Sequence, residues 1–149
     1  MEWTRQVDGY CERLDPGYWA EPVNAVTNLA FIIAALWMWQ RSRGDAMARA
    51  LCWMLAAIGV GSYLFHTHAQ VWAAVADVTP IAGFILLYLF AVNRDALGFG
   101  PWAAFGATTL FFPYAGMMVP AFGLIPGLGA SAGYAPVALL ILMYAAFLR

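Results

Sequence analysis

Apolar residues recur along this chain in stretches of about 20, separated by short polar or glycine- and proline-rich connections. An α-helix of about 20 residues is long enough to cross the hydrocarbon core of a bilayer. The pattern therefore predicts an all-α, polytopic bundle of about five transmembrane helices, at residues 22–40, 46–68, 70–92, 101–120 and 133–148. The least certain boundary is the second, because only the residues near Ala69 separate two spans.

The residues before the first apolar stretch differ in kind from the rest. Five of the chain's eight acidic residues fall within the first 21 positions: Glu2, Asp8, Glu12, Asp15 and Glu21. This predicts two parts, an acidic extramembrane segment at 1–21 and a transmembrane helical domain at 22–149. The segment lacks the basic head, apolar run and small-residue cleavage site of a signal peptide. We therefore expect the first helix to direct membrane insertion.

Composition agrees with a membrane protein, since 64% of the 149 residues are hydrophobic and 10% are charged. Soluble domains are about half apolar and a quarter charged. The net charge of −1 gives no argument for a nucleic-acid partner. With five spans alternating, five of the seven arginines share one side: Arg41, Arg43, Arg49, Arg94 and Arg149. The positive-inside tendency then predicts an integral multi-pass protein with its amino terminus outside and the Arg149 end in the cytoplasm.

Three polar residues, Ser62, His66 and Asp77, fall inside predicted spans. An aspartate at mid-membrane costs roughly 2.5 to 3.5 kcal/mol on insertion scales, so such residues persist where they have a role. Ser62 and His66 are four apart and share one helix face, and Asp77 enters the next span from the same side. Together they can hold a metal, orient a water or relay a proton. A hydrogen-bond network that only joins two helices, worth about 1 kcal/mol, is the alternative.

A second polar cluster opens the first span. Glu21, Asn24 and Asn28 recur at three- and four-residue spacing, which predicts a polar stripe that faces protein and not lipid. The amino-terminal segment also holds several carboxylates, and hard oxygen ligands of this kind suit calcium. The alternative is that the asparagines join helices and the acids form a solvated surface.

In this order the two clusters resemble the alkaline ceramidase family, within the superfamily of intramembrane hydrolases that includes the adiponectin-receptor-like proteins. The resemblance rests on "YCE" at 10–12, "AEPVNAVTN" at 20–28, "GSYLFH" at 61–66, and Asp77 with Pro80 in "ADVTP". It covers roughly the first 80 residues. The eleven-residue step from His66 to Asp77 makes the set fairly specific.

The resemblance implies a function. In that family a zinc ion inside a seven-helix bundle activates a water that hydrolyses the amide bond of ceramide, a membrane lipid. His66 would then be a zinc ligand, and Ser62 and Asp77 would be catalytic residues beside the zinc-bound water. Zinc lowers the pKa of bound water to about 7 and polarises the carbonyl. The resemblance also implies a calcium site that includes Glu12 and Glu21.

The chain departs from the family at its other end. The family's zinc site takes two more histidines from a His-x-x-x-His pair on the seventh helix, and this chain has no such pair. We expect the chain to correspond to the first five helices, with missing carboxyl-terminal helices or a partner chain supplying the other ligands. The alternative function is a non-enzymatic multi-pass membrane protein, a small carrier or receptor-like binder. In it, His66 and Asp77 would couple helices or relay protons.

Overall fold

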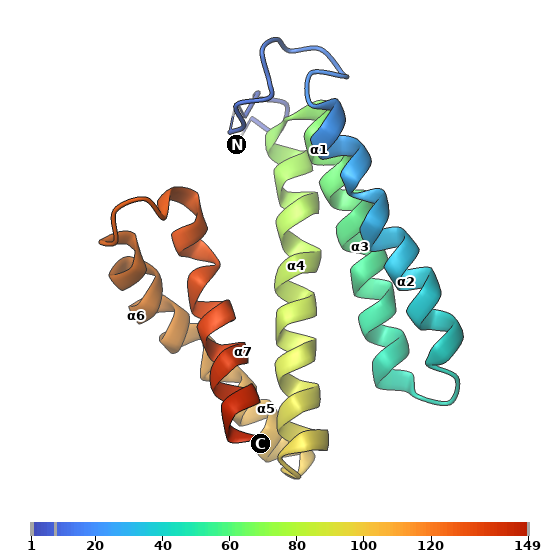
Figure 1. Ribbon diagram of the computed structural model, residues 1–149, viewed down its shortest axis with the longest axis vertical. Helices are drawn as coiled ribbons and strands as arrows, with labels where there is room; N and C mark the ends of the chain where they lie inside the picture. The colour runs from blue at the N-terminus through green and yellow to red at the C-terminus, as the bar shows by residue number, and fades with distance from the viewer. Residues whose placement is uncertain (1, 8, 149) are drawn as a thin grey trace. The chain divides into compact units, whose positions relative to one another are not determined.

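The computed structural model describes residues 2–7 and 9–148, the side chain of Ala130 excepted, and this part of the chain is helical without β-strands (Figure 1). The all-α prediction is confirmed. Asp8 and Arg149, which contribute to the predicted acidic cluster and to the predicted orientation, lie outside the described residues. The chain divides into two compact units, Met1–Phe84 and Ile85–Arg149.

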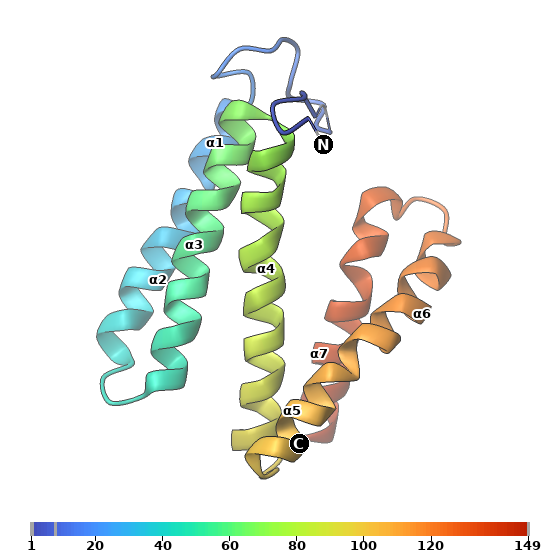
Figure 2. The ribbon, with the colours of Figure 1, turned by 180° about the vertical axis from the view of Figure 1, so that it is seen from behind.

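The first unit is a set of helices preceded by the amino-terminal segment. Its helices are α1 (Pro22–Thr27), α2 (Leu29–Arg41), α3 (Ala46–His68) and the greater part of α4 (Val71–Ala91). Helices α1 and α2 form one apolar span, Pro22–Arg41. In both views α2 and α3 lie side by side and run in opposite directions (Figures 1 and 2).

Two glycines on α3 allow its neighbours to approach closely. A Cβ atom on Gly59 would lie 2.7 Å from Cγ1 of Ile32 and 3.1 Å from the carbonyl oxygen of Asn28. A Cβ atom on Gly61 would collide with the carbonyl oxygen of Ala76 on α4. Small residues at helix contacts are typical of membrane bundles, because little hydrophobic force drives helices together in lipid. Gly61 therefore holds α3 and α4 close together beside Ser62.

The second unit begins within α4 and continues through a π-helical turn, η1 (Val92–Ala96). It then contains α5 (Pro101–Thr109), α6 (Phe111–Gly123), the 3₁₀ turn η2 (Gly129–Gly133) and α7 (Ala135–Phe147). Helices α5 and α6 form one apolar span, Pro101–Gly123, interrupted at Leu110. Proline explains this interruption, since Pro113 has no N–H and its ring conflicts with the carbonyl four residues earlier.

Four helices in the described part of the chain are long and apolar enough to cross a membrane: Pro22–Arg41, Ala46–His68, Val71–Ala96 and Pro101–Gly123. They agree with the first four predicted spans. The fifth prediction is correct as a helix, but α7 has 13 residues. At 1.5 Å per residue it is about 20 Å long, short of the roughly 30 Å hydrocarbon core. The helix is short because the preceding glycine-rich residues form η2, and Pro136 lies in the first turn of α7.

Candidate functional site

His66 lies in the last turn of α3 and is almost completely buried, with 6% of its surface exposed. Its Nδ1 atom is 2.6 Å from Oε2 of Glu21, which precedes α1. The ring also packs edge-on against Tyr10, with ring centroids 4.7 Å apart. The structure thus joins the two polar clusters that the sequence shows as separate segments.

Glu21 determines which nitrogen of His66 carries a hydrogen. Only 1% of Glu21 is exposed, and its other oxygen, Oε1, pairs with Nε of Arg13. A carboxylate paired with a guanidinium is ionised and can only accept hydrogen bonds. Nδ1 of His66 therefore donates to Glu21, and in the neutral imidazole the lone pair lies on Nε2. Nε2 makes no hydrogen bond to any of the described residues.

Ser62 and Asp77 lie at the contact between α3 and α4, one turn from His66. The Ser62 hydroxyl and the His66 ring lie close enough to the Asp77 carboxyl to interact with it electrostatically. The Oδ1 atom of Asp77 is buried and has no hydrogen-bond partner among the described residues. A buried carboxylate oxygen without a partner is costly, and it marks a place where a water or a substrate atom would bind. The structure therefore brings the three predicted residues together.

Part of this site has the chemistry of a zinc site. Histidines bound to zinc through one nitrogen usually donate from the other to a carboxylate, which is how Glu21 holds His66. A catalytic zinc usually has three protein ligands. Across the described ranges, no group of three or more His, Cys, Asp and Glu side chains is suitably placed for a metal ion. The residues thus fit one ligand of a zinc site and leave the set incomplete.

His68 does not join His66. It is the last residue of α3, and its ring packs edge-on against Tyr18 and Trp72, with centroids 5.4 Å and 5.1 Å away. Its Nδ1 atom lies 3.2 Å from the carbonyl oxygen of Leu64, within its own helix. These contacts make it a structural residue at the end of the helix.

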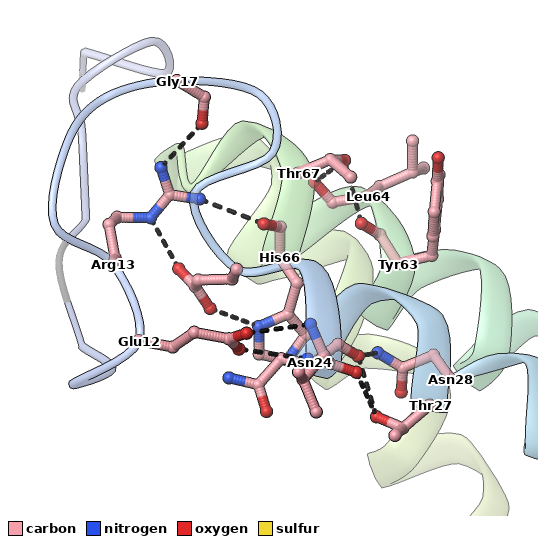
Figure 3. A network of polar contacts seen from close by, with 12 residues as sticks. Glu12, Arg13, Gly17, Asn24, Thr27, Asn28, Tyr63, Leu64, His66 and Thr67 are labelled. Atoms are coloured by element: carbon pink, nitrogen blue, oxygen red, sulfur yellow. Dashed lines mark hydrogen bonds and ion pairs between the residues drawn. The ribbon is translucent and has the colours of Figure 1, made fainter.

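Glu12 caps the first span. Its carboxylate accepts hydrogen bonds from the backbone N–H groups of Val23 at 2.8 Å and Asn24 at 3.1 Å. These groups begin α1 and have no partner inside the helix, and a carboxylate there also interacts well with the helix dipole (Figure 3).

In the polar stripe of the first span, Asn28 is the more buried of the two asparagines. Asn28 is buried, and its side chain donates to the carbonyl oxygen of Asn24 at 2.8 Å. The carbonyl oxygen of Asn28 lies beside Gly59 of α3. The stripe therefore faces α3, and the Asn28 side chain satisfies a carbonyl group of its own helix.

Arg13 belongs to this site although the sequence pattern does not identify it, because the position of its side chain depends on the path of an irregular loop. Its guanidinium donates to Glu21 and, at 3.0 Å, to the carbonyl oxygen of His66 (Figure 3). The signal in the sequence is a basic residue directly after Glu12 in an acidic segment. A calcium ion bound by Glu12 and Glu21 stays a prediction, and at Glu21 it would compete with Arg13.

The amino-terminal segment also caps α4. The backbone N–H groups of Val71 and Trp72 donate to the carbonyl oxygens of Arg5 and Trp3, each at 3.1 Å. Together with Glu12 at the start of α1 and Arg13 at the end of α3, the segment satisfies backbone groups at three helix ends. It is therefore a structured cover over the site.

Comparison with known proteins gives one match. The family model described as Ceramidase matches residues 9–144, a range that includes every residue of this site. No curated protein and no solved structure matches the chain.

Proposed function

This chain belongs to the ceramidase family, and we propose that it hydrolyses the amide bond of ceramide or a related lipid amide within the membrane. One observation carries the proposal: Ser62, His66 and Asp77 meet at one place, where a buried oxygen of Asp77 has no hydrogen-bond partner among the described residues. Ceramide itself is proposed from the family, because any long-chain amide would undergo the same chemistry.

His66 would hold zinc through Nε2, while Glu21 fixes its ring. When bound, zinc would lower the pKa of a water and polarise the substrate carbonyl. We propose that the remaining ligands come from outside the described residues, from further helices or from a partner chain. Arg13 pairs with one oxygen of Glu21, and the other oxygen accepts the hydrogen bond from His66.

Asp77, assisted by Ser62, would transfer the proton of the attacking water to the leaving nitrogen. Oδ1 of Asp77 is positioned to accept a proton from the attacking water, while the Ser62 hydroxyl orients the carboxyl group. The water oxygen forms the new bond to the carbonyl carbon, and the carbon–nitrogen bond breaks. The proton held by Asp77 passes to the leaving nitrogen, which gives a free amine and a fatty acid.

The proposed orientation puts the site in the outer leaflet. Arg41 ends α2 and Arg43 lies in the turn that follows, and this turn is at the opposite end of α2 and α3 from the amino-terminal segment (Figure 1). Arginine enrichment of that turn supports a cytoplasmic location for it. In intact cells, the exposed Cys11 should then react with a membrane-impermeant maleimide. Reaction only after permeabilisation would show that the amino terminus faces the cytoplasm, which is the opposite of the proposed orientation.

A second function is favoured by the incomplete ligand set in the described part of the chain. A non-enzymatic carrier or receptor-like binder would use His66 and Asp77 to relay protons or to couple α3 to α4. It predicts proton-coupled flux in zinc-free liposomes, whereas the hydrolase predicts amine release that requires zinc.

Hydrolysis by site variants tests the proposal. The protein is purified from its native membrane, so that further helices or a partner chain remain with it. It is then incubated with zinc and ceramide in lipid–detergent micelles, and the released amine is quantified. His66→Ala, Asp77→Asn and Ser62→Ala should each lower the rate by at least about 100-fold, because each removes a group that holds or moves the reacting water. His68→Ala is the matched control and should retain the rate. Hydrolysis that survives His66→Ala would refute this site.

A further inference from the structure

The guanidinium of Arg13 is surrounded by oxygen atoms of the kind that calcium binds. Besides Glu21, its partners are three backbone carbonyl oxygens, those of Asp15 at 3.3 Å, Gly17 at 3.3 Å and His66 at 3.0 Å. The Arg13 side chain is 5% exposed. Carboxylate and carbonyl oxygens are the ligands that calcium takes in proteins. This oxygen cage therefore encloses a cation that belongs to the chain itself.

We infer that Arg13 is the resident cation of this cage, and that the chain holds its amino-terminal segment without calcium. The resemblance implies calcium at Glu12 and Glu21, and the structure gives each of these carboxylates another partner. Glu21 pairs with Arg13, and Glu12 pairs with the backbone N–H groups that begin α1. A calcium ion at Glu21 would have to lie beside a guanidinium of the same sign, in surroundings that screen charge poorly.

Asp15, another predicted carboxylate of this segment, is also engaged. Its Oδ1 atom accepts a hydrogen bond of 2.6 Å from the backbone N–H of Gly17. This contact closes a turn that directs the carbonyl oxygens of Asp15 and Gly17 toward Arg13. The loop is thus shaped around the guanidinium, and the Asp15 side chain is used to fold it.

Arg13 connects three parts of the first unit that lie far apart in the sequence. It contacts its own loop, the residue that opens the first span, and the carbonyl oxygen of His66 in the last turn of α3. A positive charge at a helix carboxyl end is favourable, because the last carbonyl groups have no partner within the helix. The guanidinium of Arg13 has several N–H donors in a fixed fork, so it can make all of these contacts at once. The ammonium group of a lysine is a point charge without this geometry. Arg13 is a positioning residue that acts on His66 through Glu21.

The test measures cation binding, so its outcome does not depend on the proposed reaction. Thermal unfolding of the full chain in detergent is followed with excess chelator and with millimolar calcium. Terbium luminescence, excited through nearby aromatic residues, reports binding directly. The variants are Arg13→Ala, Arg13→Lys, Glu21→Gln and, as the matched control, Arg5→Ala, which removes an exposed arginine from the same segment.

Wild type and Arg5→Ala should show the same Tm with chelator and with calcium, and no terbium signal. Arg13→Ala should lower the Tm by about 5 °C or more in chelator, because it leaves the buried carboxylate of Glu21 without its guanidinium counter-ion. Calcium should restore much of that loss, and terbium should bind. The Tm of Arg13→Lys in chelator should lie between those of wild type and Arg13→Ala, because lysine keeps the positive charge and lacks the forked donors of the guanidinium.

Two results would overturn the inference. One is a wild-type Tm that rises with calcium and loses this response in Glu21→Gln. The other is an Arg13→Ala variant that neither regains stability with calcium nor binds terbium. If Arg13→Ala is recovered only when calcium is present throughout purification, the inference is supported. If Arg13→Ala cannot be purified as a folded protein even with calcium present, the result counts against the inference.

Discussion

At the residue scale, the site depends on the two contacts that the buried carboxylate of Glu21 makes. Glu21 contacts Arg13 with one oxygen and His66 with the other, and the pair of contacts fixes the hydrogen of His66 on Nδ1. The spacing of Ser62 and His66 on one helix face is readable from the sequence. The contact between Arg13 and Glu21 cannot be predicted from the sequence, because it depends on the path of a loop with no regular pattern.

Glu21→Gln tests this arrangement, since it keeps the size of the side chain and removes its charge. The buried guanidinium of Arg13 then lacks its counter-ion, and we expect a loss of about 3 kcal/mol in the free energy of unfolding. The rate of amide hydrolysis should fall roughly 10- to 100-fold, as for other carboxylates that orient a metal-binding histidine. Glu2→Gln, which changes an exposed carboxylate of the same segment, should leave both quantities unchanged. A normal rate in Glu21→Gln would exclude Glu21 as the group that orients His66.

At the element scale, α3 and α4 are placed by a glycine and a very short connection. Helix α3 ends at His68 and α4 begins at Val71, with Ala69 in the left-handed conformation between them. This boundary was predictable, because an apolar stretch as long as 46–91 cannot cross a bilayer as one helix. The close contact at Gly61 was not, because a glycine in an apolar run has no signal that distinguishes packing from chance.

Gly61→Ala should separate the two helices. The added methyl group meets the carbonyl oxygen of Ala76, and overpacking of this kind costs roughly 1 to 3 kcal/mol in the free energy of unfolding. The same shift would move Ser62 away from Asp77, so the hydrolysis rate should fall more than stability alone explains. Gly106→Ala on α5 is the control, because a Cβ atom there meets nothing within 4 Å. If the two variants have the same free energy of unfolding and the same hydrolysis rate, close packing at Gly61 does not position the site.

The second unit contains its own buried polar contact. Asn93, in η1, accepts a hydrogen bond of 2.9 Å from the Tyr144 hydroxyl and lies 3.4 Å from Oγ1 of Thr108. Partners on α5 and α7 satisfy both ends of its amide. This cluster therefore connects the helices of the second unit.

At the scale of the whole molecule, the sequence predicts the class of protein better than the extent of its parts. Four spans follow from apolar length, and the ceramidase family follows from short polar segments that the family model also matches. The fifth helix was predicted as 133–148 because its residues are apolar. Hydropathy does not show that Gly133 ends a 3₁₀ turn and that the α-helix starts at Ala135. The division at Phe84 likewise lies inside one continuous helix, where no sequence boundary marks it.

The most direct test of the account is the amount of zinc bound per chain. Wild type and the variants His66→Ala and His68→Ala are expressed in their native membrane, so that further helices or a partner chain can supply the other ligands. They are purified in detergent with zinc, and metal and protein are quantified after removal of loosely bound ions. We predict that wild type and His68→Ala retain zinc and that His66→Ala loses it, because Glu21 presents Nε2 of His66 alone as a ligand. Equal zinc in all three, or none in wild type, would contradict the proposal that His66 is the metal-binding centre of a hydrolase.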